Sequence, residues 1–193
     1  MGCPLSAEAL RSGPPGDDDD DEDDVVQVSL SAQSRQVIKQ SWREIQDDIS
    51  RVGIITFVRL FETHPECKDV FFMFKDVDDP ETLRTSRELR AHGLRIMSFI
   101  EKTIVRIDQD QRLDQLILDL GRKHYRYDAP PKYYKFVGAE FIQAMRPVLK
   151  ERWTSEQEEA WKTLFLYISS TMKRGFQQEQ RNQRNQRTSE TTT

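Results

Sequence analysis

Cysteine is scarce in this chain, with only two in 193 residues. Cys3 lies near the N-terminus in a segment without apolar patterning, and Cys67 lies within the patterned region. A disulfide-stabilised secreted module is therefore excluded, and a reducing compartment is favoured. Cys67 has no CxxC partner and the chain has only three histidines, so a structural zinc site is not expected either.

Long apolar runs are also missing. The longest, Val52 to Val58, is interrupted by a glycine and a threonine, whereas a membrane-spanning helix needs about 20 apolar residues. The N-terminus has neither the basic start nor the apolar stretch of a secretory signal. We therefore expect the chain to stay in the cytosol or on the cytosolic face of a membrane.

The sequence also lacks a concentrated basic patch. The net charge is -4, but one of the 29 basic residues and nine of the 33 acidic residues precede Val25, so the remainder carries four net positive charges. Those basic residues are spread over many segments, and the acidic run at residues 17–24 (DDDDDEDD) would repel phosphates. A nucleic-acid partner is not expected.

The first six residues, MGCPLS, match the pattern for N-myristoylation at Gly2, and Cys3 stands in a usual position for palmitoylation. Two acyl chains give a stable membrane anchor, whereas one gives only reversible binding. The sequence therefore predicts lipidation at Gly2 and Cys3, the alternative being an accidental match. Residues 1–30 are expected to form a disordered extension, whose acidic run either holds the domain away from the lipid or is a solvated tail without a spatial role.

Apolar residues recur at helical spacing in six segments, and no alternating run favours a strand. Ser31 can cap the first segment, the third runs from about Thr85 to Arg106, and Pro147 should bend or fray the end of the fifth. The apolar stripes are Ile38, Trp42, Ile45 and Ile49; Ile54, Val58 and Phe61; Leu89, Gly93, Ile96, Ile100 and Ile104; Leu113, Leu116, Ile117 and Leu120; Tyr134, Val137, Phe141, Met145 and Val148; and Trp161, Leu164, Phe165, Ile168 and Met172.

This pattern predicts one all-α domain over residues 31–176, with six main helices and a looser Phe-rich stretch from Val70 to Pro80. The last helix is expected to end near Phe176. Residues 177–193 contain no apolar residue and are predicted to form a disordered tail.

Two of the three histidines fall on apolar helix faces. His92 lies at the edge of the third stripe and His124 continues the fourth, while His64 stands at a helix end before Pro65, where a structural role is expected. Taken singly, His92 and His124 are more often hydrogen-bonded core residues than ligands. Together, two helices that each bring an imidazole to one apolar cavity can hold an iron porphyrin between them.

The chain resembles the globin family over essentially all of residues 31–176. The resemblance rests on Ser41-Trp42, on FVRLFETHPE from Phe57, on HGLRI from His92, on LGRKH from Leu120 and on PKYYKFVG from Pro131. It implies a globin fold around haem b, with His124 as the proximal iron ligand and His92 as the distal ligand or a hydrogen-bond donor to bound oxygen. It implies pocket positions for Phe71 (the wedge on the porphyrin face), Phe74, Ile96, Leu120, Tyr134, Val137 and Phe57, and for Arg95 at a propionate.

The MGC start, the acidic extension and the globin body together resemble globin X, a membrane-associated branch of the family whose members tend to bind haem with both histidines. This resemblance implies binding of oxygen, nitric oxide, nitrite and carbon monoxide, contact with membrane lipid through acyl chains, and a reductase or electron-transfer partner. Redox chemistry, with nitrite reduction or nitric oxide removal as a side activity, is the leading hypothesis. A pentacoordinate oxygen-storage globin and a haem-free, membrane-tethered interaction module are the alternatives.

Overall fold

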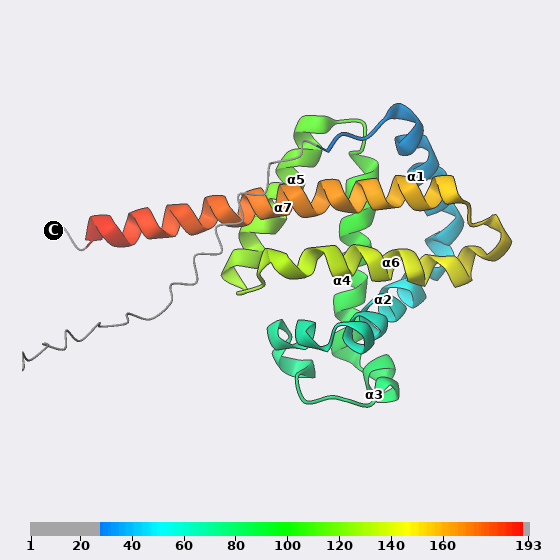
Figure 1. The fold of residues 1–193 in the computed structure, drawn as a ribbon, viewed down its shortest axis with the longest axis horizontal. Coiled ribbons are helices and arrows are strands. Elements are labelled where there is room, and N and C mark those ends of the chain that lie inside the picture. The colour runs from blue at the N-terminus through cyan, green and yellow to red at the C-terminus, as the bar shows by residue number, and fades with distance from the viewer. Residues whose placement is uncertain (1–27, 191–193) are drawn as a thin grey trace, which may run out of the picture.

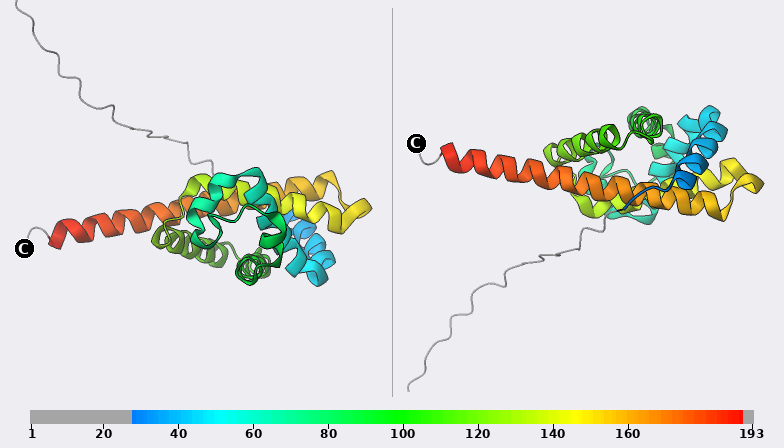
Figure 2. Two further views of the ribbon diagram at one scale, coloured as in Figure 1. Left: turned by 90° about the horizontal axis from the view of Figure 1, so that it is seen from below. Right: turned by 90° about the horizontal axis from the view of Figure 1, so that it is seen from above.

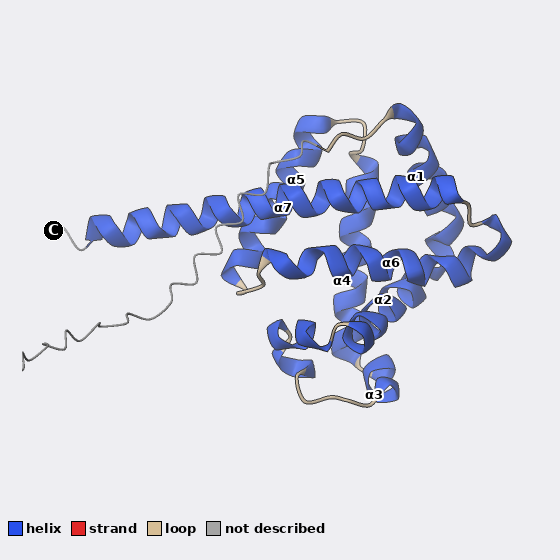
Figure 3. Cartoon of the chain, in the orientation of Figure 1, coloured by secondary structure: helices blue, strands red, loops and turns tan. Residues whose placement is uncertain are grey.

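The computed structural model describes residues 28–190. Gly2 and Cys3, where lipidation is predicted, and the acidic run at residues 17–24 lie outside the described residues. The described part contains helices, turns and loops and no strand (Figure 3). The prediction of an all-α domain is confirmed.

Six long helices and one short helix make up this part of the chain (Figure 1). They are α1 (Ala32–Ile45), α2 (Ile49–Thr63), α3 (Pro80–Thr85), α4 (Arg87–Val105), α5 (Asp110–Arg126), α6 (Tyr134–Leu149) and α7 (Ser155–Glu190). Short 3-10 turns connect several of them, at Gln46–Asp48, Pro65–Val70, Phe72–Phe74, Pro131–Tyr133 and Lys150–Arg152.

Side-chain caps fix several helix starts. The Ser31 hydroxyl accepts a hydrogen bond from the amide of Ser34 at 3.0 Å, as expected from the sequence. Ser86 caps α4 in the same way, through the amide of Leu89 at 3.2 Å. The short helix α3 was not expected; it begins at Pro80, and the Asp79 carboxylate caps it by accepting from two backbone amides.

The helices enclose two buried clusters. α7 lies alongside α6 and packs against α5 and α1, while α2 packs against α4 and α6 (Figures 1 and 2). The larger cluster surrounds Trp161, whose indole Nε1 donates to the buried Ser41 hydroxyl at 2.9 Å. The smaller cluster is rich in phenylalanine and includes Phe57, Phe61 and Phe74. Ile96 packs against both clusters, on the same helix as His92.

Glycines allow two close helix crossings beside the candidate histidines. A Cβ added at Gly93, the neighbour of His92, would lie 2.9 Å from the Gly53 carbonyl carbon on α2. A Cβ added at Gly121, one turn before His124, would lie 2.1 Å from the Met172 carbonyl oxygen on α7. These positions need glycine because the backbones approach so closely, and both crossings fix the helix that carries a histidine.

The last helix is longer than expected. α7 continues to Glu190, so the prediction of a disordered tail beginning at residue 177 is wrong as far as residue 190 (Figure 2). No helix-breaking residue follows Gly175, and glutamine, arginine and glutamate propagate a helix once it is seeded. An ion pair between Arg126 and Glu179 at 2.9 Å also ties the first turn beyond Phe176 to α5.

Within residues 28–190 we find no helix that combines the length and the apolar character needed to cross a membrane. The fifth predicted helix, α6, ends at Leu149, two residues after Pro147, as its sequence suggested.

Candidate functional site

His124 lies near the C-terminal end of α5, with its imidazole half-buried. Its Nδ1–H donates a hydrogen bond to the Leu120 carbonyl at 2.9 Å, one helical turn back. Because a carbonyl can only accept, this bond places the proton on Nδ1 and leaves the lone pair on Nε2 available to a ligand. The same arrangement orients histidine ligands of metals in proteins.

The surroundings keep the His124 ring uncharged. Burial lowers the pKa of His124 from its ordinary value, and the hydrogen bond to Leu120 offsets this only in part. The Tyr134 ring packs edge-to-face against the imidazole at a centroid distance of 5.4 Å. Tyr134 is itself held by a hydrogen bond from its hydroxyl to the Ala129 carbonyl at 3.1 Å, and burial raises its pKa. His124 is therefore a neutral imidazole in a fixed orientation.

His92 lies on α4 among aromatic rings. The Phe57 and Phe71 rings meet its imidazole edge-on, at centroid distances of 4.7 Å and 5.0 Å. Burial, together with smaller effects of the neighbouring Arg95 and His124, lowers the pKa of His92 to about 4. The influence of His124 means that the two imidazoles lie within electrostatic reach of each other.

The His92 ring nitrogens have no hydrogen-bond partner among the described residues. Neither nitrogen is among the buried side-chain atoms that lack a partner, so the unpaired His92 nitrogens can be reached from outside the polypeptide. His92 is thus neutral at pH 7, confined by two phenylalanines, and free to bind a ligand that is not part of the polypeptide.

The Phe-rich stretch supplies the remaining aromatic wall. The half-buried Phe71 contacts Phe57, Phe61 and Phe74 at centroid distances of 5.8, 5.3 and 6.3 Å. Phe74 is buried and also packs against Phe61, at 5.7 Å. Phe71 therefore stands between this aromatic cluster and the His92 ring, in the stretch where the sequence predicted a wedge against a flat ligand.

Lys68 holds this stretch in place, a role that the sequence did not reveal. Its side chain is only 11% exposed, and its ammonium group donates to the Val77 carbonyl at 2.7 Å and lies 3.4 Å from the Asp78 carboxylate. The loop that carries Phe71 and Phe74 is thereby closed on itself. Lysine is among the residues least often buried, so no pattern in the sequence could have singled out Lys68.

The other predicted pocket residues lie on the elements around the two histidines. Ile96, Leu120 and Val137 are half-buried and pack against the two apolar clusters. Arg95 is exposed and has no ion pair with any described residue, so its guanidinium is available to an anionic group at the rim.

The third histidine is structural. The His64 ring stacks on Phe136 at a centroid distance of 3.8 Å, and its Nδ1 lies 3.4 Å from the Glu66 carboxylate. It does not cap the end of α2 through its side chain. Among residues 28–190 no group of three or more histidine, cysteine or acidic side chains is arranged to hold a metal ion, so a metal here would have to arrive with its own ligands.

These features fit an iron porphyrin. Iron takes a neutral imidazole as an axial ligand, and His124 offers Nε2 in a fixed orientation while His92 is neutral and lacks a protein partner. The walls are phenylalanine and aliphatic, as a flat apolar macrocycle requires, and Arg95 supplies a cation at the rim. His124 would hold the iron, with Leu120, Tyr134 and Val137 beside it and Phe71 against the ring.

Comparison with known proteins also points to a haem-binding fold. The Globin family model matches residues 55–172, which is more than half of the chain. Cytoglobin-1 of Oryzias latipes is 25% identical over 77% of this chain and 85% of its own, and neuroglobin of Tetraodon nigroviridis is 26% identical over 76% and 92%. The crystal structure of a hexacoordinated haem protein from an anhydrobiotic tardigrade, determined at pH 4, has the same fold, with a TM-score of 0.72, 20% identity, and coverage of 78% of this chain and 97% of that one.

The cofactor follows from the family and from the donor set in the pocket. Globins carry haem b and bind oxygen and other small gaseous ligands, and the two histidines and the aromatic wall of this chain are suited to such a cofactor. The family model and the fold together show that the chain belongs to the globin family.

Proposed function

We propose that this globin binds haem through both histidines in its resting state, with His124 as the permanent ligand and His92 as a displaceable one. The observation that carries the proposal is the His92 imidazole, which is neutral, enclosed by Phe57 and Phe71, and without a partner among the described residues. The hexacoordinated state of a protein with the same fold supports it.

His92 would then set the affinity for external ligands by competition. A ligand can bind only when His92 has moved away, so the apparent affinity is reduced by the fraction of molecules with an open site. When bound, haem supplies an iron that ligates small molecules and exchanges single electrons. His92 contributes no proton at pH 7, because its pKa of about 4 leaves it unprotonated, and it acts as a gate.

Such a gate suits redox chemistry better than bulk oxygen carriage. We propose oxygen, nitric oxide, nitrite and carbon monoxide as the ligands, and a reductase or electron-transfer protein as the partner that returns the iron to the ferrous state. The sequence of residues 1–6 supports acylation at Gly2 and Cys3, and hence action at the cytoplasmic face of a membrane, probed as described below. These are the properties of the globin X branch.

The kinetics of carbon monoxide binding to the reduced protein test the gate. We expect the observed rate to level off at high carbon monoxide concentration, at the rate with which His92 departs. In His92→Leu the rate should rise linearly with concentration, because nothing competes. His64→Gln is the matched control, since His64 stacks on Phe136 away from His92, and it should behave as the unaltered protein. A linear dependence in the unaltered protein would contradict the proposal and favour the oxygen-storage alternative.

Acylation is tested separately, in animal cells fed with clickable myristate and palmitate analogues. Gly2→Ala should lose both labels and move the protein from the membrane to the soluble fraction. Cys3→Ser should keep myristate, lose palmitate, and bind the membrane only weakly. Equal membrane recovery of all three proteins would contradict the tether and leave the haem assignment untouched.

A further inference from the structure

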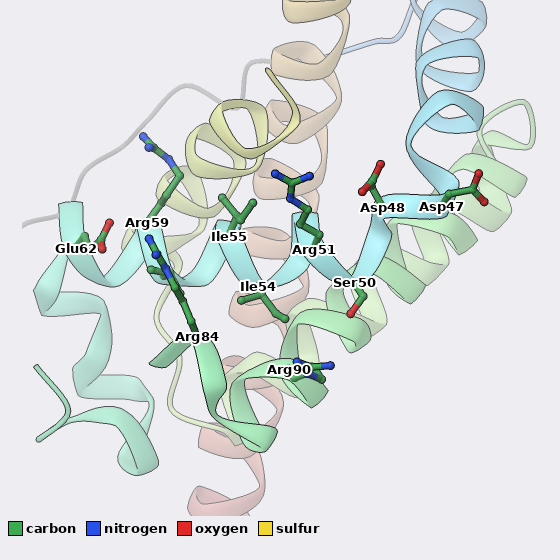
Figure 4. A pocket seen from close by; sticks show the side chains of 11 residues that line it. Asp47, Asp48, Ser50, Arg51, Ile54, Ile55, Arg59, Glu62, Arg84 and Arg90 are labelled. Carbon is green, nitrogen blue, oxygen red and sulfur yellow. The ribbon is translucent and has the colours of Figure 1, made fainter. Parts of the chain in front are cut away.

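A groove of about 690 Å³ lies outside the haem site, on the surface formed by α2 with α3 and the start of α4 (Figure 4). Its floor is apolar and comes from α2, and its walls carry charged side chains from all three helices. The lining residues are Asp47, Asp48, Ser50, Arg51, Ile54, Ile55, Val58, Arg59, Glu62, Arg84 and Arg90.

Two of the four arginines in this groove are held by carboxylates. Arg59 donates from Nε to Glu140 at 2.8 Å, and Thr63 donates to the same buried carboxylate at 3.0 Å. This arrangement fixes the Arg59 guanidinium and leaves its terminal nitrogens without a partner among residues 28–190. Arg84 pairs with Glu81 one turn earlier on α3, at 2.8 Å.

The other two arginines are unpaired. Arg51 on α2 and Arg90 on α4 make no ion pair or hydrogen bond with any described side chain, although Asp47, Asp48 and Glu62 line the same groove. The guanidinium donors of Arg51 and Arg90 are therefore not engaged by these carboxylates and remain available to an external anion. Arg51 and Arg90 come from different helices, so a ligand that fills the groove would lie against both α2 and α4.

We propose that this groove binds a phosphate-bearing ligand. Arginine presents donors in a planar fork that matches the oxygens of a phosphate, and phosphates with several charges are the anions best suited to several arginines at once. The volume is that of a small-molecule site, which favours a phosphorylated metabolite or a lipid headgroup over a folded partner. The isoleucines of the floor, Ile54 and Ile55, give an apolar strip for the carbon skeleton that carries the phosphates.

The full-length, haem-loaded protein, produced without acylation, is used for the test. Inositol hexakisphosphate is titrated by calorimetry at low ionic strength, and sedimentation with phosphatidylcholine vesicles containing phosphatidylinositol bisphosphate measures binding to a headgroup. The double variant Arg51→Gln/Arg90→Gln should weaken binding at least about tenfold, because it removes two charge-assisted contacts. Arg51→Lys/Arg90→Lys should recover only part of it, since lysine keeps the charge and lacks the fork.

The matched control is Arg43→Gln/Arg87→Gln, which removes the same charge from exposed arginines on α1 and α4 that do not line the groove. It should bind within about twofold of the unaltered protein. Saturable binding of inositol hexakisphosphate without vesicle binding identifies a soluble phosphate as the ligand; vesicle binding that inositol hexakisphosphate displaces identifies a headgroup. Equal losses in both double variants, or binding of neither probe, would overturn the proposal. These readouts do not depend on iron coordination. The binding results therefore test the groove separately from the proposal that His92 is a displaceable iron ligand.

Discussion

Replacing Gly121 by alanine tests how the helix that carries His124 is positioned. The added Cβ would lie 2.1 Å from the Met172 carbonyl oxygen and 2.9 Å from its carbonyl carbon, against about 3.5 Å for an unstrained contact. α5 and α7 must therefore separate by about 1 Å. Overpacking costs about 1–3 kcal/mol, and the upper part of that range, about 2–3 kcal/mol, applies here because the clash is with backbone atoms and not with a flexible side chain. The better helix propensity of alanine returns about 1 kcal/mol.

The net loss is about 1–2 kcal/mol, which for a domain of this size lowers the melting temperature by roughly 2–8 °C. Since His124 lies one turn further along α5, haem should also transfer faster to an excess of apomyoglobin. Gly53→Ala is the comparison variant: its Cβ would lie 3.0 Å from the Gly93 backbone and 3.1 Å from the flexible Met97 side chain, so a smaller loss is expected. Urea unfolding followed by circular dichroism measures both. If Gly121→Ala were as stable as the unaltered protein, or more stable than Gly53→Ala by a wide margin, the reasoning would be refuted.

Three further predictions concern the buried polar groups. Ser41→Ala removes the acceptor of the buried Trp161 Nε1–H, so the free energy of unfolding should fall by about 1–3 kcal/mol in urea titrations, and an unchanged midpoint would contradict this. Burial raises the pKa of the Cys67 thiol to about 11, so in a Cys3→Ser background iodoacetamide should label Cys67 slowly in the native protein and rapidly in urea; rapid native labelling would contradict it. The pKa of His92 falls from 6.5 to about 4 on folding, so above pH 6.5 both states leave it neutral, whereas toward pH 4 the unfolded chain takes up the proton first. The stability of the haem-free protein should therefore drop as pH falls through this window, by up to about 3 kcal/mol, and His92→Leu should flatten the drop; parallel pH profiles for the two haem-free proteins would argue against it.

The long helices could be predicted from the sequence because each carries apolar residues along one face. The stripes led by Ile38, Leu89 and Trp161 are buried except for the half-buried Ile49 and Ile96, as their spacing required, and the Ser31 cap lies where expected. The helix α3 was missed because six residues are too few to show a period. The end of α7 was missed because its last turns carry no apolar stripe. Helix propensity and contacts with α5, among them the Arg126–Glu179 ion pair and a hydrogen bond from Arg122 to Gln178, support it instead.

The assignment of His92 and His124 to one pocket could be predicted because an imidazole on an apolar helix face indicates a buried or ligand-binding role. Their protonation and partners could not, because these depend on neighbours far away in the chain: Phe57 and Phe71 around His92, and Tyr134 against His124. Lys68 and the arginine groove are tertiary features in the same sense. Nothing in the order of residues tells that Arg51 and Arg90 share a surface while the nearby carboxylates leave them unpaired.

The visible spectrum of the purified, deoxygenated, dithionite-reduced protein tests the central claim most directly. Two sharp, well-resolved α and β bands, replaced by one broad band in His92→Leu, are the predicted result, because they report two imidazoles on the iron and the loss of one. A single broad band in the unaltered protein would contradict the claim that His92 is the second ligand.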